Sequence, residues 1–334
     1  MNRSTTSTLA ALRKTAMATA MALLGAAGIA CSGTQMTGDP FAENSSSALT
    51  ADASSDVRLA APFVSADQLW KDVETMVEFG PRHTASPAQA KFLDHLEGWM
   101  RRIGLVDIGR DVVTLSGPNA FTAKGAPTSG TSHHLYGYLP GTTAEDIILG
   151  VHSDGQNSVE ENGTIVAMEI VEYLSKLPKS MRKRGVLVVF PTSHMASSDS
   201  EEATGWVQKH RARLSNVVAI VSPEHMGTIG TVFGQPQDFR IWATSPALRR
   251  AATLATSAPS IPKTTIASYG IGSAILWRQA TNLPTLGGMS IPFYLFDPSK
   301  EMEVLDKQRL FAQADAFRRI MLSVDGMSRN DLGL

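Results

Sequence analysis

Residues 147–154, Ile147-Ile148-Leu149-Gly150-Val151-His152-Ser153-Asp154, decide the fold. The stretch begins with five nearly all-apolar residues, which is typical of a central strand that is buried on both faces of a sheet. Comparable apolar runs cover residues 186–190 and 217–221. Helical patterns separate the three runs, and this alternation predicts that the three strands lie in a mostly parallel sheet.

Two helix starts precede these strands. Ser65-Ala66-Asp67-Gln68 is a capping-box pattern, and Ser86-Pro87 places a proline at the first position of a helix that ends near Gly104. We expect an α/β fold with a mostly parallel, mixed central sheet and helices on both faces, in three αβα layers. The other predicted helices cover residues 165–177, 203–214, 248–254, 274–280 and 305–322, and the other predicted strands cover residues 112–115, 135–139 and 291–296.

The N-terminal residues have the features of a secretory signal. Arg3, Arg13 and Lys14 supply positive charge. The small and apolar run 16–30 that follows is too short for a membrane-spanning helix and ends at Cys31, the only cysteine of the chain. This pattern resembles a bacterial lipoprotein signal, in which the cysteine is lipidated and becomes the first mature residue. We favour that interpretation over an ordinary cleavable signal.

Composition sets the expected domain boundaries. Residues 1–30 form the signal peptide, and residues 32–60 are so rich in small and polar residues that we expect a flexible tether. Residues 61–334 are expected to form one α/β domain. We expect the protein to be located in the cell envelope, where it is either anchored by a lipid or free in the periplasm or outside the cell. The lipidated N-terminus would be its only contact with a membrane.

The net charge argues against nucleic-acid binding, and the cysteine count excludes a disulfide within the chain. The 334 residues carry a formal net charge of −1 and show no basic stripe, so we expect no nucleic-acid partner. A single cysteine cannot form a disulfide within the chain, and the exported domain must therefore be stable through its own core.

Polar side chains follow each of the three buried strands. The carboxyl ends of parallel strands meet at one edge of a sheet, which is where ligands bind in such folds. Imidazole and carboxylate groups are the ligands that zinc uses when thiolates are absent. The side chains that follow the strands are His152, Asp154, Glu160, Glu161, His194, Glu224 and His225.

Several motifs resemble the co-catalytic zinc aminopeptidases, the family that contains bacterial leucyl aminopeptidases and relatives of glutaminyl cyclase. Phe79-Gly80-Pro81-Arg82 is similar to the opening motif of that family, and Leu139-Pro140-Gly141 is a second match. The run from Ile147 to Asp154 is similar to the strand that leads into the family's His-x-Asp motif. The resemblance covers most of residues 65–323 and implies a peptidase-like domain with a peptide as substrate or ligand.

The resemblance also implies roles for individual residues. The first metal ligand of the family corresponds to His152, and the acid that orients it corresponds to Asp154. The bridging acid corresponds to Glu160, with Glu161 as the neighbour that can replace it. A further ligand corresponds to Glu224.

Two positions depart from the family pattern. The third loop of the family carries two adjacent glutamates, a general base and a ligand, where this chain has Ser193-His194. The final histidine of the family is absent from Tyr269-Gly270-Ile271-Gly272-Ser273. The resemblance is strongest to a divergent subgroup with altered metal-site residues, which implies His194 as a ligand beside Glu224-His225. These departures favour one zinc ion over two, and leave Glu161 or His225 as the candidate base.

Two functions remain open at this stage. The favoured one is an exported zinc-dependent hydrolase of the aminopeptidase type, with a divergent site. The alternative is a catalytically inactive lipoprotein of the peptidase fold that binds peptides or a partner, because fold alone does not determine function. A serine hydrolase and a Rossmann dehydrogenase are disfavoured, since the chain lacks both Gly-x-Ser-x-Gly and a suitably placed Gly-x-Gly-x-x-Gly.

Overall fold

The computed structural model describes the chain from residue 57 onward, with short gaps. The described ranges are 57–116, 126–194, 202–232, 235–236, 239–257, 261, 264–267, 270, 272–292, 294–295, 297 and 299–334. The expected signal peptide, Cys31 and the expected tether up to residue 56 lie outside them. The described part begins with a 3-10 helix, η2 (Val57–Ala60). None of the described helices has both the length and the apolar content that crossing a lipid bilayer requires.

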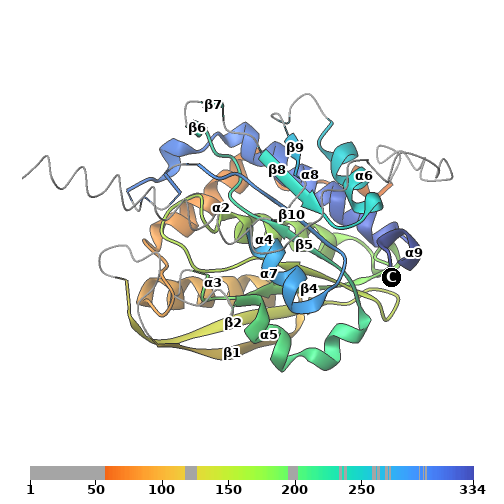
Figure 1. Ribbon diagram of the computed structural model, residues 1–334, viewed down its shortest axis with the longest axis horizontal. Coiled ribbons are helices and arrows are strands. Elements are labelled where there is room, and N and C mark those ends of the chain that lie inside the picture. The colour runs from red at the N-terminus through yellow and green to blue at the C-terminus, as the bar shows by residue number, and fades with distance from the viewer. Residues whose placement is uncertain are drawn as a thin grey trace, which may run out of the picture. The chain divides into compact units, whose positions relative to one another are not determined.

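A mixed sheet of eight strands forms the centre of the described domain (Figure 1). The strand order is β1-β2-β4-β3-β5-β10-β8-β9, and the four inner strands β4, β3, β5 and β10 run parallel. A separate two-stranded hairpin consists of β6 and β7. The bounds are β1 (Val106–Ser116), β2 (Ser129–Leu139), β3 (Asp146–Gly150), β4 (Gly185–Phe190), β5 (Val217–Pro223), β6 (Thr231–Val232), β7 (Gln235–Pro236), β8 (Phe239–Ala243), β9 (Thr264–Ile266) and β10 (Thr285–Met289).

Helices cover both faces of this sheet, as the sequence predicts. The two predicted caps are present, because the side chains of Ser65 and Ser86 each accept a hydrogen bond from the backbone three residues later, at 3.1 Å. The helices are α2 (Ala66–Glu78), α3 (Pro87–Arg102), α4 (Asn162–Lys176), α5 (Glu202–Lys209), α6 (Pro246–Ala255), α7 (Gly272–Thr281), α8 (Lys307–Gly326) and α9 (Arg329–Leu332), with 3-10 turns η3 (Lys179–Met181), η5 (Arg211–Asn216) and η6 (Met302–Val304).

The apolar core lies in two layers, one on each face of the sheet. Residues alternate between the layers along β3: Ile147 and Leu149 pack with the α2, α3, α4, α6 and α8 side, whereas Ile148 packs with the α5 and α7 side. Trp206 from α5 and Trp277 from α7 fill the second layer. The alternation follows from the two-residue period of a strand, and it confirms the three-layer α/β architecture that the sequence predicts.

The predicted strand at 291–296 is wrong. The strand that pairs in the sheet is β10, Thr285–Met289, which begins six residues before the predicted strand. Its two glycines disguise it, because glycine has a low preference for strands. The structure shows why they are needed: a Cβ atom at Gly287 would lie 2.2 Å from Ala274, and one at Gly288 would lie 2.9 Å from Phe317.

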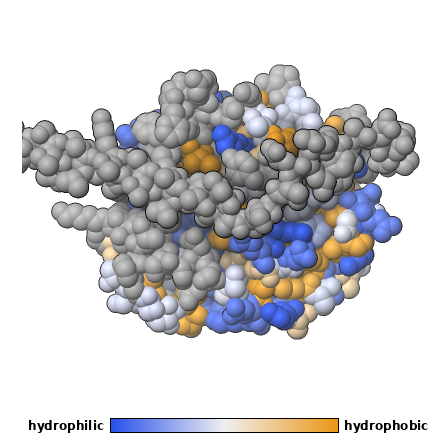
Figure 2. Space-filling model, in the orientation of Figure 1, coloured by the Kyte–Doolittle hydropathy of each residue, from blue (hydrophilic) through white to orange (hydrophobic). Residues whose placement is uncertain are grey.

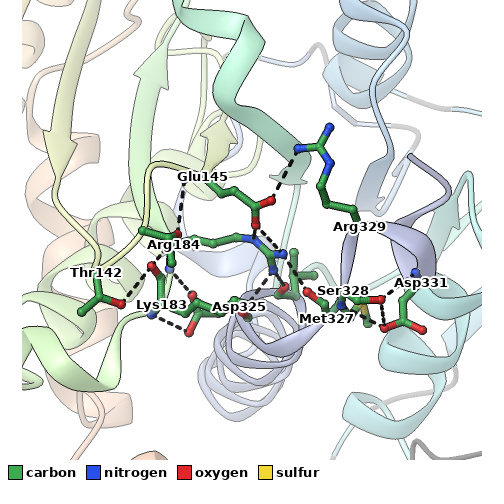
Figure 3. A network of polar contacts seen from close by, with 11 residues as sticks. Thr142, Glu145, Lys183, Arg184, Asp325, Met327, Ser328, Arg329 and Asp331 are labelled. Atoms are coloured by element: carbon green, nitrogen blue, oxygen red, sulfur yellow. Dashed lines mark hydrogen bonds and ion pairs between the residues drawn. The ribbon is translucent and has the colours of Figure 1, made fainter.

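Arg184 ties the end of α8 to the start of β4 (Figure 3). Its buried guanidinium donates to the backbone carbonyls of Val324 at 2.6 Å and Met327 at 2.7 Å, and it pairs with Glu145 at 2.9 Å. The carboxylate of Asp325 in turn accepts from the backbone N–H of Arg184 at 2.7 Å. The carbonyl groups at the C-terminus of α8, which lack partners within the helix, are thereby satisfied by a cation.

Hydrophobic and hydrophilic residues are interspersed on the face of the molecule that Figure 2 shows. Exposed apolar side chains of the described domain include Val112, which is 56% exposed on β1, and Leu254, which is 56% exposed on α6. Isolated exposed apolar residues of this kind are normal for a folded domain and carry no functional meaning by themselves.

Candidate metal centre

Three parallel neighbours bring the candidate residues together. Strand β3 lies between β4 and β5, so the carboxyl ends of the three strands meet at one edge of the sheet. His152 follows β3, His194 follows β4, and His225 follows β5. The imidazole rings of His152 and His194 stack with their centroids 3.9 Å apart, and the ring of His225 lies edge-on to His152 at 6.2 Å.

His152, Glu224 and His225 form a group of potential metal ligands. Each offers one donor atom, and these atoms all lie within 4.8 Å of one another. Nε2 of His152 and Oε2 of Glu224 are 4.0 Å apart. All three residues are buried, and among the described residues neither Nε2 of the two histidines nor Oε2 of Glu224 has a hydrogen-bond partner.

Backbone carbonyls fix the protonation of both histidines. Nδ1 of His152 lies 2.8 Å from the carbonyl oxygen of Asp154, and Nδ1 of His225 lies 3.0 Å from that of Ser290. A carbonyl can only accept, so Nδ1 carries the proton and Nε2 presents its lone pair. Burial keeps both rings neutral, since it lowers the pKa of His152 well below its usual value and that of His225 to about 3. Metal-binding histidines are oriented in this way by their other ring nitrogen.

Glu224 is oriented by one of its two oxygens. Its Oε1 accepts from the backbone N–H of Ser273 at 2.8 Å and from the hydroxyl of Ser222 at 3.2 Å, which leaves Oε2 facing the two histidines. The loop is tightly built: His225 has a positive φ of 47°, a conformation that costs energy for a residue other than glycine. A Cβ atom at Gly163 would lie 2.0 Å from the carbonyl oxygen of Pro223, so only glycine lets the start of α4 approach β5.

Two further glutamates precede α4 in the same region. Glu160 is buried, and neither of its carboxyl oxygens has a partner among the described residues. Glu161 pairs through Oε1 with Nε of Arg82, while its Oε2 has no partner in the described part of the chain. Burial raises the pKa of Glu160 to about 8, and burial opposed by Arg82 raises that of Glu161 to about 7. Both carboxyls can therefore exchange a proton near neutral pH.

His194 has a different environment from the other two histidines. Its Nδ1 lies 2.8 Å from Oε2 of Glu202, the first residue of α5, and the hydroxyl of Ser273 donates to the other oxygen of Glu202 at 2.5 Å. Burial lowers the pKa of His194, but the carboxylates of Glu202, Glu224 and Asp154 outweigh it and raise the pKa to about 10. His194 thus carries a positive charge in this arrangement.

The donor set fits a zinc ion. Two imidazoles and one carboxylate are the ligands of a common type of catalytic zinc site, which keeps its fourth position open. The geometric reason is that the three buried donor atoms converge and have no partners in the described part of the chain. Electrostatics gives a second reason: burial raises the pKa of Glu160 to about 8 and those of Glu161 and Glu224 to about 7, because their ionised forms are poorly solvated here. A divalent cation would compensate for this cost of ionisation.

Some of the site residues predicted from the sequence belong to this group of potential metal ligands, and others lie beside it. His152 and Glu224 share one donor group with His225, which the sequence assigned as a candidate base. His194 stacks on His152 instead of joining that group. Asp154 contacts His152 through its backbone oxygen, while its carboxylate accepts from Thr84 and, at 3.4 Å, from the backbone of His194.

The sequence reasoning missed three polar residues of this site. Arg82 was recognised only as part of a motif, yet it holds Glu161. Ser273 stands where a histidine was expected, and it donates to both Glu224 and Glu202. Glu202 lies just before the predicted helix 203–214 and was not singled out, because acidic residues at helix starts are common for electrostatic reasons alone. The one signal for Glu202 in the sequence is that it forms a pair of adjacent glutamates with Glu201.

Comparisons with known proteins show a similarity of fold and none of sequence. No family model matches the sequence, and no curated protein matches it. Solved structures do match. They include BSAP, a zinc aminopeptidase from Bacillus subtilis, with a TM-score of 0.64 at 11% identity over 81% of this chain and 98% of that one.

Two further solved structures also have a similar fold at low sequence identity. The Porphyromonas gingivalis glutaminyl cyclase matches with a TM-score of 0.62 at 14% identity, over 78% of this chain and 98% of that one. The Legionella pneumophila LapA aminopeptidase matches with a TM-score of 0.61 at 12% identity, over 86% and 78%. The chain therefore has the fold of zinc-dependent aminopeptidases and glutaminyl cyclase, as the sequence resemblance implied.

Proposed function

We propose that the protein is a zinc-dependent hydrolase of peptides, of the aminopeptidase type, with a single zinc ion. The observation that carries this proposal is the convergence of Nε2 of His152, Oε2 of Glu224 and Nε2 of His225, each buried and without a partner among the described residues. The names of the similar structures support the same reaction class.

The chain's own residues provide binding and proton transfer in this proposal. His152, Glu224 and His225 would hold the zinc, which would supply Lewis acidity when bound. Glu161 would accept a proton from the attacking water, because Arg82 holds one oxygen of its carboxyl group while Oε2 has no partner among the described residues. Glu160 is the second candidate acceptor. The positive charge of His194 attracts carboxylate or carbonyl oxygen of a substrate beside His152.

We further propose that the protein is exported and held at the cell envelope by a lipid on Cys31. The support is the sequence pattern of residues 1–31, namely its basic start, its short apolar run and the cysteine at its end. A peptide hydrolase in that compartment would meet peptides outside the cytoplasm.

Hydrolysis of a panel of aminoacyl anilides and short peptides tests the function. The full chain should turn over substrates with a free α-amino group, should lose this activity to a chelator, and should regain it with zinc. A glutaminyl peptide belongs in the panel, because release of ammonia from it would indicate cyclisation in place of hydrolysis. Zinc-bound, folded protein that turns over nothing would favour the alternative, a peptidase fold that binds peptides without cleaving them.

Variants of the two glutamates sharpen this test. Glu161→Gln should keep the zinc and lower turnover by roughly 10²–10⁴, the usual contribution of a general base. Glu160→Gln separates the two candidates for that role. Glu74→Gln is the matched control, since Glu74 lies on the exposed side of α2 and contacts Trp70. If Glu161→Gln and Glu160→Gln both turn over as fast as the control, neither glutamate is the base.

A further inference from the structure

A cavity lies away from the candidate metal centre. Its volume is about 480 Å³, which falls in the usual range for small-molecule sites. Residues 62–65 and helices α2, α3 and α4 enclose it, and α4 contributes residues from Glu169 to Lys176. The metal centre lies before the first turn of α4, whereas Glu169 is seven residues further on, about 10 Å along the helix.

Two carboxyl groups face each other in this cavity. Glu169 from α4 is only 6% exposed, and Oδ2 of Asp72 from α2 is buried without a hydrogen-bond partner among the described residues; both side chains line the cavity. Oδ1 of Asp72 also accepts from the side-chain amide of Gln68 at 2.9 Å. Among the described residues, no basic side chain forms an ion pair with either acid. Lys176, which also lines the cavity, pairs with Glu172 at 2.7 Å instead.

Aromatic side chains form another part of the cavity wall. Trp99 is 5% exposed and is held by a hydrogen bond from its Nε1 to Glu172 at 2.5 Å. Tyr173 is held by its hydroxyl, which donates to the carbonyl oxygen of Arg58. The ring of His95 lies edge-on to Trp99, with centroids 6.3 Å apart. Aromatic faces beside carboxylates favour cations that carry an apolar body.

A metal ion does not suit this cavity. In the part of the chain that the structure describes, the only group of three histidine, cysteine or acidic side chains with converging donor atoms is the one at His152, Glu224 and His225. The acids of the cavity come in a pair, and the remaining space is far larger than a metal ion. An organic cation matches both the charge and the volume.

We propose that this cavity binds a small primary ammonium compound, with its nitrogen between the carboxyls of Asp72 and Glu169 and its carbon chain against Trp99 and Tyr173. An ammonium group has three hydrogen-bond donors, which can reach both carboxyls at once. No part of this proposal depends on the metal centre or on its activity.

Binding of such a cation has to release a proton. Burial and the neighbouring Asp72 and Glu172, opposed by Lys176, raise the pKa of Glu169 to about 9, so Glu169 carries a proton at neutral pH. The other groups that face it are His95 and Arg102 from α3. A positive charge between the two acids lowers their pKa and displaces this proton. Affinity should therefore rise about tenfold per pH unit up to about pH 9.

Isothermal titration calorimetry of the full chain with n-butylammonium chloride tests the proposal. Repeating the titration at pH 7.5 in two buffers of different ionisation enthalpy gives the number of protons released. We expect saturable binding with release of about one proton per ligand. The neutral analogue 1-butanol, which has the same size, should bind far more weakly.

Two variants make the result specific. Glu169→Gln keeps the size of the side chain and should weaken binding roughly ten- to a hundredfold, the effect of losing one hydrogen bond to a charged group. It should also abolish proton release. Glu74→Gln removes an acid from the exposed side of α2, outside the cavity, and should bind like the wild type. Thermal unfolding of Glu169→Gln verifies that the variant is folded.

Three outcomes would overturn the proposal. They are the absence of saturable binding to folded wild type, equal affinity for n-butylammonium and 1-butanol, and unchanged affinity in folded Glu169→Gln. Asp72→Asn provides a second, independent variant if Glu169→Gln fails to fold, and the same loss of affinity is expected of it.

Discussion

Nδ1 of His194 lies 2.8 Å from Oε2 of Glu202, so that the loop after β4 is fastened to the first residue of α5 beside the candidate metal centre. Glu202 is fully buried and also accepts from Ser273 at the start of α7. One carboxylate thus connects three segments that the sequence separates by about 80 residues, from His194 to Ser273.

Removing Glu202 should therefore destabilise the fold. In Glu202→Ala the charge of His194 loses its buried partner, and we expect the free energy of unfolding to fall by about 3–5 kcal/mol. Glu202→Gln keeps the size and the hydrogen-bonding capacity and should cost less. Urea unfolding followed by fluorescence gives both values. A loss below about 1 kcal/mol in Glu202→Ala would mean that the pair is no stronger than an exposed one.

The network at Arg184 gives a second stability prediction (Figure 3). Arg184→Met leaves the terminal carbonyls of α8 without their cation and should lower the free energy of unfolding by about 3–5 kcal/mol. Arg329→Met is the matched control, because Arg329 contacts the same Glu145 at 3.5 Å from a half-exposed position. It should cost about 0–1 kcal/mol. Equal losses in the two variants would contradict the account.

Stability should also depend on pH through Glu169. Its pKa is raised to about 9 in the folded chain from a usual value of 4.5, so between these values the folded state binds one more proton than the unfolded state. The free energy of unfolding therefore falls as the pH rises, by at most about 1.4 kcal/mol per unit. Chemical unfolding at pH 5, 6.5 and 8 should show wild type losing stability relative to Glu169→Gln. A constant difference between the two would contradict the raised pKa.

Export gives a prediction for the N-terminus. The mature protein purified from its native membrane should lack Met1–Ala30 and carry a lipid on Cys31, as intact-mass spectrometry would reveal. Cys31→Ser should abolish the lipid. An intact Met1, or an unmodified Cys31 at a processed N-terminus, would exclude the lipoprotein interpretation.

The apolar strands could be predicted because burial on both faces leaves a direct trace in the sequence. The runs at 147–151, 186–190 and 217–221 became β3, β4 and β5, and their order in the sheet placed His152, His194 and His225 together. Short outer strands have a weaker pattern of apolar residues in the sequence. In β8, Phe239, Ile241 and Ala243 alternate with partly exposed residues, a pattern too short to separate from a loop.

The finer roles within the site could not be predicted, because they depend on side-chain direction. Sequence spacing showed that His194 and His225 both follow buried strands. It could not show that a carbonyl at Ser290 would leave Nε2 of His225 without a proton, or that Glu202 would hold His194. These partners come from segments far away in the chain, and only the packed fold brings them near.

The zinc content of the purified full chain, compared with that of His225→Ala, tests the central claim most directly. Elemental analysis after zinc loading and desalting should find about one zinc ion per wild-type chain, because two imidazoles and one carboxylate bind zinc tightly. Folded His225→Ala should retain almost none, since it loses one of the three donors that converge in the described part of the chain. Folded wild type that holds no zinc, or His225→Ala that holds as much as wild type, would contradict the assignment of this site.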